Sequence, residues 1–171
     1  MSAALDAGFV ELDWRGRPLR LECAWVGAPR EEAAATVVFL HEGLGSLSMW
    51  RDFPRAFCER HGFAGFVFSR YGYGRSTPRP HDERWTPDFM ARQADEVLPA
   101  LFAASGIERP WLFGHSDGAT IALLHAARHE VAGVVAVAPH LFVEDVSIAS
   151  IAGARDAYEH GDLRERLARH H

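Results

Sequence analysis

The chain has 171 residues and a mass of 19.0 kDa, and its 48% hydrophobic and 24% charged residues are typical of a globular domain, which excludes a disordered or collagen-like chain. Its 18 basic and 23 acidic residues give a net charge of -5, and no run of like charges forms a tail. A nucleic-acid or anionic-membrane partner is therefore not expected. All 18 basic residues are Arg, so a Schiff-base lysine and a P-loop lysine are both excluded.

The N-terminal segment Met1–Phe9 lacks the basic and apolar regions of a secretory signal. No apolar run approaches the roughly 20 residues that a membrane helix needs. Cys23 and Cys58 fall in segments predicted to be a strand and a helix, which indicates buried, reduced thiols and not a disulfide framework. The protein is therefore expected to be cytoplasmic, with no membrane partner.

A β-hairpin is the first predicted structure. Apolar and polar residues alternate over Phe9–Trp14 and again over Leu19–Cys23, with a turn at Arg15-Gly16-Arg17 between them. The continuous apolar run Thr36–Leu40 is typical of a strand buried on both faces. Similar apolar runs bounded by Gly or Pro predict three further strands, at Phe66–Ser69, Trp111–Phe113 and Val134–Ala138.

Segments with helical spacing of apolar residues separate these strands. One predicted helix ends at Gly62, a second follows a Thr86 cap and is kinked by Pro99, and a third covers Ala119–Arg128. Strands that alternate with helices predict an α/β fold, in which a mostly parallel sheet carries helices on both faces.

The strand signals end at Pro139. The stretch Val146–Leu167 is predicted to form one or two helices, broken near Gly161. We therefore divide the sequence into an α/β core at residues 1–140 and a helical segment at residues 141–171.

The strongest motif is Gly114-His115-Ser116-Asp117-Gly118, a G-x-S-x-G between an apolar strand and an apolar helix. A strand that turns sharply into a helix holds the central hydroxyl above the sheet, and the flanking residues must be Gly because a Cβ would collide there. Ser116 is therefore a candidate nucleophile. The backbone N–H of Asp117, at the helix N-terminus, is a candidate donor to an oxyanion formed at Ser116.

A second motif, His41-Glu42-Gly43-Leu44-Gly45-Ser46, directly follows the predicted strand Thr36–Leu40. With these two motifs the chain resembles the α/β-hydrolase superfamily, in particular its serine ester hydrolases, over about Phe9 to Pro139. Such proteins carry His-Gly-x-x-Gly-Ser here, and Glu42 replaces the first Gly. The resemblance implies that the N–H of Gly43 is the other oxyanion donor and that His41 is structural or lines the pocket. We expect the Glu42 carboxylate to be paired with a partner such as an Arg, or turned outward.

A third segment, from Ser69 to Ser76, matches the family pattern Asp-x-Arg-Gly-x-Gly-x-Ser only in its second half. Ser69 and Tyr71 stand in place of the Asp and the Arg, and a plain surface loop is the alternative interpretation. Candidates for the wall of a substrate pocket are His41, Glu42, Trp50, Tyr71 and Tyr73. Each aromatic residue among them is as well explained as an ordinary core or loop residue.

Metal and dinucleotide sites are not supported by the sequence. His41-Glu42 begins like the zinc motif H-E-x-x-H, but Gly45 occupies the place of the second His. Gly72-Tyr73-Gly74 is not followed by the third Gly of a dinucleotide fingerprint. The pair His170-His171 is more typical of a solvated helix end than of a metal site. We therefore expect no metal, no cofactor and a small-molecule substrate.

The base and the acid of a catalytic triad are not evident. In the α/β-hydrolase order they follow the nucleophile along the chain, and the last strands of that fold are not found here. The later acids nearest the sheet are Glu144 and Asp145, and the later histidines are His140, His160, His170 and His171. The resemblance makes Asp145 a candidate acid, since some members of the family place it after the sixth strand. We predict that none of these histidines is held against Ser116 and that the helical segment resembles the start of a cap.

We therefore predict an α/β-hydrolase-like fold with an N-terminal β-hairpin and without its last strands. The predicted function is acyl transfer to water on a small ester, thioester or related carbonyl compound, with the machinery incomplete in this chain. The alternative is a non-catalytic module or inactive fragment of the same fold that binds a ligand or partner. A sheet that ends at Val134–Ala138 would expose an apolar edge strand, through which the chain is expected to self-associate.

Overall fold

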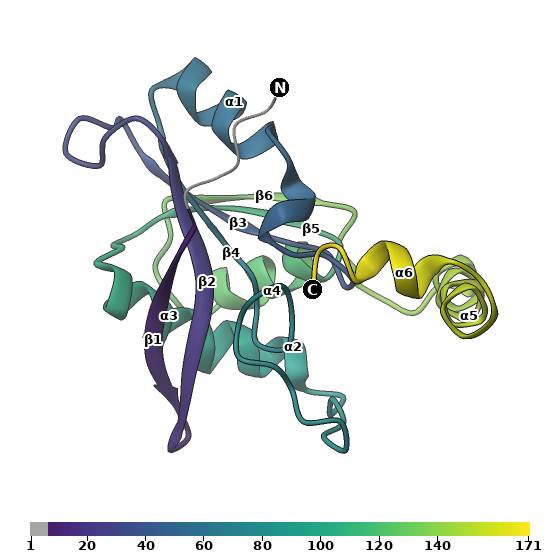
Figure 1. The fold of residues 1–171 in the computed structure, drawn as a ribbon. Coiled ribbons are helices and arrows are strands. Elements are labelled where there is room, and N and C mark those ends of the chain that lie inside the picture. Colours follow the sequence, from purple (N-terminus) through teal and green to yellow (C-terminus); the bar gives the residue numbers. More distant parts are fainter. Residues whose placement is uncertain (1–6) are drawn as a thin grey trace.

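The computed structural model describes residues 7–171. Most of the stretch Met1–Phe9, for which no secretory signal is expected, lies outside these residues. They form a six-stranded sheet in the order β1-β2-β4-β3-β5-β6 (Figure 1). Its strands are β1 (Gly8–Trp14), β2 (Arg17–Gly27), β3 (Thr36–Leu40), β4 (Ala64–Phe68), β5 (Trp111–His115) and β6 (Gly133–Val137).

The sheet is mostly parallel. β2 pairs antiparallel with β1 and with β4, whereas β4, β3, β5 and β6 run parallel to one another. The predicted fold class, including the N-terminal hairpin, is confirmed.

Most predicted strand ends differ from the observed ones by one or two residues, but β2 continues four residues past the predicted end at Cys23. At the start of β4 and of β6 the difference arises because glycines lie inside the strands instead of bounding them. Gly65 belongs to β4 and Gly133 to β6. A Cβ on Gly65 would come within 2.7 Å of Cys58 Sγ, and a Cβ on Gly133 within 2.3 Å of the Trp111 ring. Gly65 therefore permits the helix that carries Cys58 to pack closely on the sheet, Gly133 leaves room for the Trp111 ring, and neither glycine marks a turn.

Successive residues of β3 supply two separate cores. Val38 and Leu40 belong to the core beneath one face of the sheet, and Val37 and Phe39 belong to the core on the other. Because β3 is buried on both faces, its sequence is apolar throughout, which is why the predicted and observed bounds agree.

Helices cover both faces of the sheet (Figure 1). α1 (Phe53–His61) lies on one face and ends at Gly62, whose φ of 67° is left-handed. On the other face lie the remaining core helices, α2 (Phe89–Arg92), α3 (Leu98–Ser105) and α4 (Asp117–Ala126).

The second predicted helix differs from the observed one. It begins at Phe89 after Asp88, and not after a Thr86 cap. A π-helical turn at Gln93–Val97 separates α2 from α3, and Pro99 lies in the first turn of α3. Because proline has no N–H to donate, the interruption falls just before Pro99 in place of a kink at it.

The C-terminal segment forms α5 (Asp145–His160) and α6 (Leu163–Leu167), which separate near Gly161 as predicted. α5 lies away from the sheet and has no buried residue, whereas α6 leads back toward the core, where His171 accepts the N–H of Gly74 at 2.9 Å (Figure 1). β6 is an edge strand of the described sheet, and Val135 and Val137 on it are 41% and 42% exposed. Self-association through this edge stays a prediction. No helix of residues 7–171 is long and apolar enough to cross a membrane.

Candidate active site

Ser116 forms the turn between β5 and α4. Its φ of 54° and ψ of -117° are unusual for a residue with a side chain, and such a conformation costs on the order of 1–3 kcal/mol. The Ser116 N–H donates to the Val137 carbonyl on β6 at 2.9 Å, and the Ser116 carbonyl accepts the N–H of Ala119 at 3.0 Å. Bonds to a strand on one side and a helix on the other thus hold the strained turn that the motif predicts.

The two flanking glycines are required by close backbone contacts. A Cβ on Gly114 would lie 2.4 Å from the Gly118 carbonyl oxygen, and a Cβ on Gly118 would lie 2.0 Å from the Leu40 carbonyl oxygen. The prediction that both positions must be Gly is confirmed. The second contact also presses the start of α4 against the end of β3.

The strand order places a loop on each side of Ser116. β3 lies on one side of β5 and β6 on the other, and all three run parallel. Their carboxyl ends therefore meet at one edge of the sheet, where ligands of open α/β sheets bind. The loop after β3 begins with His41, and the segment after β6 leads to His140.

His140 is the histidine that faces Ser116. Its Nε2 lies 2.8 Å from Ser116 Oγ. Thr120 on α4 clamps the backbone of His140, because its hydroxyl accepts the His140 N–H at 2.8 Å and donates to the His140 carbonyl at 3.3 Å. The prediction that no histidine is held against Ser116 is wrong. Ala138, between β6 and His140, has a left-handed backbone with a φ of 50°.

No acid of the described residues occupies the place of a triad acid. A triad acid accepts the N–H of the histidine nitrogen that faces away from the nucleophile. Asp117 Oδ1 lies 3.6 Å from His140 Nε2, the nitrogen that already faces Ser116. Within residues 7–171, no hydrogen bond joins His140 Nδ1 to Glu144 or Asp145, and both acids are exposed.

Gly43 and Glu42 lie beside the start of α4. A Cβ on Gly43 would be 3.0 Å from Asp117 Oδ2, so the two residues whose N–H groups are candidate oxyanion donors are neighbours. The Glu42 side chain folds over Gly45, and its Oε2 lies 3.7 Å from His115 Nδ1. Within residues 7–171 no Arg forms an ion pair with the Glu42 carboxylate, and its distance to the His115 ring is longer than a hydrogen bond.

A cavity of about 750 Å³ opens in front of Ser116. Glu42, Gly43, Asp117 and His140 line it together with Ser116. Much of its remaining wall is apolar and comes from α5 and α6, through Val146, Ile151, Ala154, Tyr158, Leu163 and Leu167. The cavity suits a small substrate with an apolar group next to the Ser116 hydroxyl.

Four other predicted wall residues lie away from this cavity. Trp50 packs against Phe39 in the core on the α1 face. Tyr71 is buried, and its hydroxyl donates to Glu83 at 2.6 Å. Burial and this bond raise the pKa of Tyr71 to about 12. Trp50 and Tyr71 therefore have structural roles, because both are packed in the core and neither lines the cavity.

His41 and Tyr73 lie behind the loop that carries Gly43. His41 is fully buried, so it is structural and does not line the cavity. Its Nδ1–H donates to the Glu42 carbonyl at 2.8 Å, and its Nε2 accepts the backbone N–H of Arg70 at 3.0 Å. Burial and the nearby Arg70 charge lower the pKa of His41 well below its ordinary value. Tyr73 packs edge-on against the His41 ring, with centroids 5.2 Å apart.

Arg70 is a residue at this site that the sequence analysis missed. Its side chain is 2% exposed, and its guanidinium donates to the carbonyls of His41 and Glu42. The one available signal is its place one residue before the Arg position of the family pattern. Nothing in the sequence indicates that its charge is buried.

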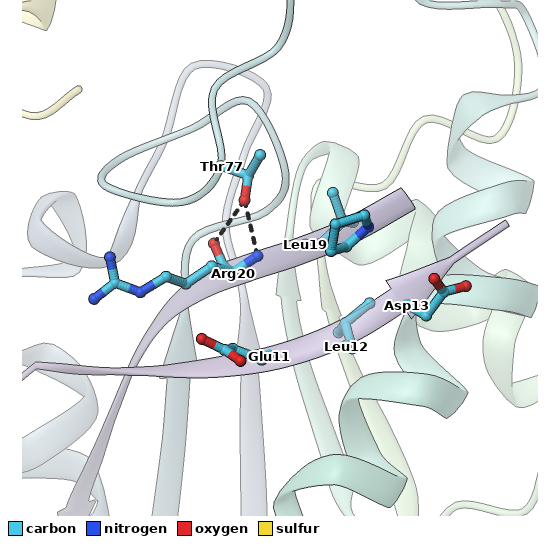
Figure 2. Close-up of a pocket in the computed structure, with 7 residues that line it drawn as sticks. Glu11, Leu12, Asp13, Leu19, Arg20 and Thr77 are labelled. Atoms are coloured by element: carbon cyan, nitrogen blue, oxygen red, sulfur yellow. Dashed lines mark hydrogen bonds between the residues drawn. The ribbon is translucent and has the colours of Figure 1, made fainter. Parts of the chain in front are cut away.

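A second hollow, of about 450 Å³, lies on the β1–β2 hairpin beside Thr77 (Figure 2). Thr77 Oγ1 accepts the Arg20 N–H at 2.8 Å and donates to the Arg20 carbonyl at 3.3 Å. The hollow is lined by Glu11 and Asp13 but by neither Ser116 nor a histidine. Its clearest role is structural, since Thr77 anchors the loop after β4 to β2.

The comparisons with known proteins agree with this geometry. A family model described as the alpha/beta hydrolase fold matches residues 35–167. The chain therefore belongs to the α/β-hydrolase fold family. No curated protein sequence matches it.

Several solved structures are similar to it. One is a membrane phospholipase A described as a bacterial virulence factor, with 26% identity and a TM-score of 0.62, covering 76% of this chain and 38% of that one. Another, reported among carboxylesterases of the thaumarchaeon Nitrososphaera gargenis, has 19% identity, a TM-score of 0.70 and coverages of 88% and 54%. A thermophilic esterase from Thermogutta terrifontis has 18% identity, a TM-score of 0.65 and coverages of 91% and 54%.

The two esterase matches show the fold alone, and the chain spans between 38% and 54% of the length of these three proteins. The family and its esterase-like structural neighbours support a hydrolase.

Proposed function

We propose that this chain carries a serine hydrolase centre that transfers the acyl group of a small ester, thioester or related carbonyl compound to water. The observation that supports it most is the 2.8 Å distance between Ser116 Oγ and His140 Nε2 at the strained turn. A nucleophilic serine needs a base within hydrogen-bond reach, and this pair meets that condition.

In the proposed reaction His140 Nε2 takes the hydroxyl proton of Ser116 while Oγ bonds to the substrate carbonyl carbon. The backbone N–H groups of Gly43 and Asp117 stabilise the resulting oxyanion. The tetrahedral intermediate then expels the leaving group, which receives the proton from His140. Water attacks the acyl-serine by the same steps in reverse, with His140 again as the base, so no cofactor is needed.

The apolar wall that α5 and α6 contribute supports an apolar acyl or alcohol group on the substrate. The membrane phospholipase A and the esterases among the similar structures agree with ester chemistry. The activity of those longer proteins is theirs, and for this chain ester hydrolysis is the proposal.

Covalent labelling with a fluorophosphonate tests the proposal. We expect the reagent to modify Ser116, and the Ser116→Ala variant to lose the label. Ser150→Ala is the matched control, because Ser150 lines the same cavity and has no hydrogen-bonded histidine among the described residues. Labelling that persists in Ser116→Ala, or is absent from the unaltered chain, would favour the non-catalytic alternative.

A further inference from the structure

A buried cation lies behind the loop that carries Gly43. Arg70 follows β4, and its guanidinium donates from Nη1 to the His41 carbonyl at 2.8 Å and from Nη2 to the Glu42 carbonyl at 2.9 Å. Burial lowers the pKa of Arg70 from its ordinary value. A guanidinium nonetheless stays protonated in proteins, so the site holds a full positive charge.

The Glu42 carbonyl is the focus of these contacts. It accepts hydrogen bonds from Arg70 Nη2, from His41 Nδ1 at 2.8 Å and from the N–H of Gly45 at 3.1 Å. Three donors on one carbonyl oxygen fix the orientation of its peptide plane.

That peptide plane also contains the N–H of Gly43. In a trans peptide the C=O and the N–H point in opposite directions. A carbonyl held toward Arg70 therefore turns the Gly43 N–H away from Arg70, and Gly43 lines the cavity that contains Ser116. Donors on a carbonyl also polarise its peptide, which strengthens the N–H as a donor.

The charge of Arg70 offsets a second feature of the site. The Asp117 carboxylate is negative and adjoins Ser116 in sequence, which opposes an oxyanion there. Arg70 Nη2 lies 3.9 Å from Asp117 Oδ2. A cation at this distance counters the field of the carboxylate where it is partly buried.

Arg70 has a rigid support, so its placement is not that of a mobile surface arginine. The loop that carries it is anchored to β2 by Thr77, which bonds the Arg20 backbone (Figure 2), and by Ser76, whose Oγ accepts the Glu22 N–H at 2.9 Å. The guanidinium of Arg70 also stacks over the ring of Tyr73, with Cζ 5.0 Å from the ring centroid.

We infer that Arg70 is a positioning residue for the proposed acyl transfer: it aims the Gly43 N–H at the oxyanion and supplies positive charge behind it. The inference rests on the proposed function. It concerns stabilisation of the tetrahedral state and not binding of the planar substrate, because Arg70 does not itself line the cavity and acts on it only through the Glu42 carbonyl and the Asp117 carboxylate.

Arg70→Met tests this, since methionine removes the charge and both donors. We expect kcat for p-nitrophenyl acetate to fall by about tenfold or more, less than the 10²–10³ lost with an oxyanion donor itself. KM should change by less than about twofold. The inhibition constant of a phenylboronic acid, which forms a tetrahedral adduct on serine, should rise in parallel with the loss of kcat.

Arg75→Gln is the matched control, because Arg75 lies on the same loop and pairs with Glu22 at 2.8 Å, away from the Gly43 loop. We expect Arg75→Gln to change the stability of the protein but not to lower kcat at constant KM, as Arg70→Met should. Arg70→Lys, which keeps the charge but offers a single donor group, should recover part of the lost kcat, and it decides the question if Arg70→Met fails to fold.

The outcomes separate the two proposals. If Ser116→Ala abolishes a measurable reaction but Arg70→Met and Arg70→Lys keep the kcat of the unaltered chain, or lose kcat only as Arg75→Gln does, the role of Arg70 is refuted and the serine hydrolase stands. If the unaltered chain shows no reaction or labelling that depends on Ser116, the proposed function fails, and the role of Arg70 fails with it.

Discussion

Replacing His140 with Gln is the sharpest test of the Ser116 site. Glutamine keeps a polar side chain of similar length but cannot accept the hydroxyl proton. Because His140 Nε2 is 2.8 Å from Ser116 Oγ, we expect His140→Gln to lower kcat to the value of Ser116→Ala.

The size of the loss follows from the missing acid. In a complete Ser–His–Asp triad, removing the serine or the histidine costs roughly 2 × 10⁶ in kcat, and removing the acid alone costs roughly 3 × 10⁴. A serine and a histidine without an acid therefore retain a factor of roughly 70 over the site without its nucleophile. Since no acid of residues 7–171 bonds His140 Nδ1, we expect the unaltered chain to exceed Ser116→Ala by 10- to 100-fold, as an order-of-magnitude estimate.

The assay is p-nitrophenyl acetate hydrolysis by protein free of contaminating esterase, with the inactive variants purified in the same way. His160→Gln is the control, because His160 is 72% exposed on α5 and bonds only to Asp156 within the described part of the chain. A His140→Gln variant with unaltered kcat would refute the role of His140. A ratio of about a thousand or more over Ser116→Ala would show that an acid does orient the histidine.

Three further predictions concern the supports of the site. Thr120→Val removes both hydrogen bonds to the His140 backbone, and we expect it to lower kcat about tenfold with a loss of roughly 1 kcal/mol in the free energy of unfolding, measured by urea titration. Gly118→Ala should lower the free energy of unfolding by about 3 kcal/mol, because its Cβ would meet the Leu40 carbonyl oxygen at 2.0 Å. Gly153→Ala in α5 is the control and should raise this free energy slightly, since a Cβ there has nothing within 4 Å. Equal effects of the two substitutions would contradict the packing argument. Burial raises the pKa of Glu22, but hydrogen bonds from Arg75 and Ser69 outweigh it and lower the net value. Its stabilising contribution is therefore present above the ordinary carboxyl pKa of about 4.3 and is lost as pH falls through the folded pKa. We expect Glu22→Gln to lower the free energy of unfolding at pH 7 and to lower it less in acid. A loss of free energy that does not depend on pH would contradict this.

The sequence predicts those features that local patterns determine. β3 is a continuous apolar run because both of its faces are buried, and the Ser116 turn follows from Gly114 and Gly118, since neither position has room for a Cβ. Helices α5 and α6 also follow from apolar spacing and Gly161. In each case the physical cause lies within a few residues of the pattern.

His140 and Arg70 could not be placed in the same way, because their positions depend on contacts between distant segments. His140 reaches Ser116 because β6 pairs with β5, Ala138 adopts a left-handed backbone, and Thr120 holds the His140 backbone. Arg70 is buried because the carbonyls of the loop after β3 take its hydrogen bonds. An arginine in a polar loop is otherwise more often exposed, so the pattern alone favours the wrong position.

Substitution of Glu42 tests whether its side chain has a structural or a catalytic role at the loop that carries Gly43. Its carboxylate lines the cavity, folds over Gly45 and lies 3.7 Å from His115 Nδ1. A negative charge at this wall opposes an oxyanion at Ser116, while the backbone of Glu42 contributes through its carbonyl and not through its side chain. We therefore expect Glu42→Gln to leave kcat within about fivefold of the unaltered chain, with any change an increase that shrinks at high salt as charge screening requires. Glu59→Gln, an exposed carboxylate on α1, controls for the change in net charge. A decrease in kcat for Glu42→Gln alone to the value of Ser116→Ala would mean that the carboxylate itself takes part in the reaction.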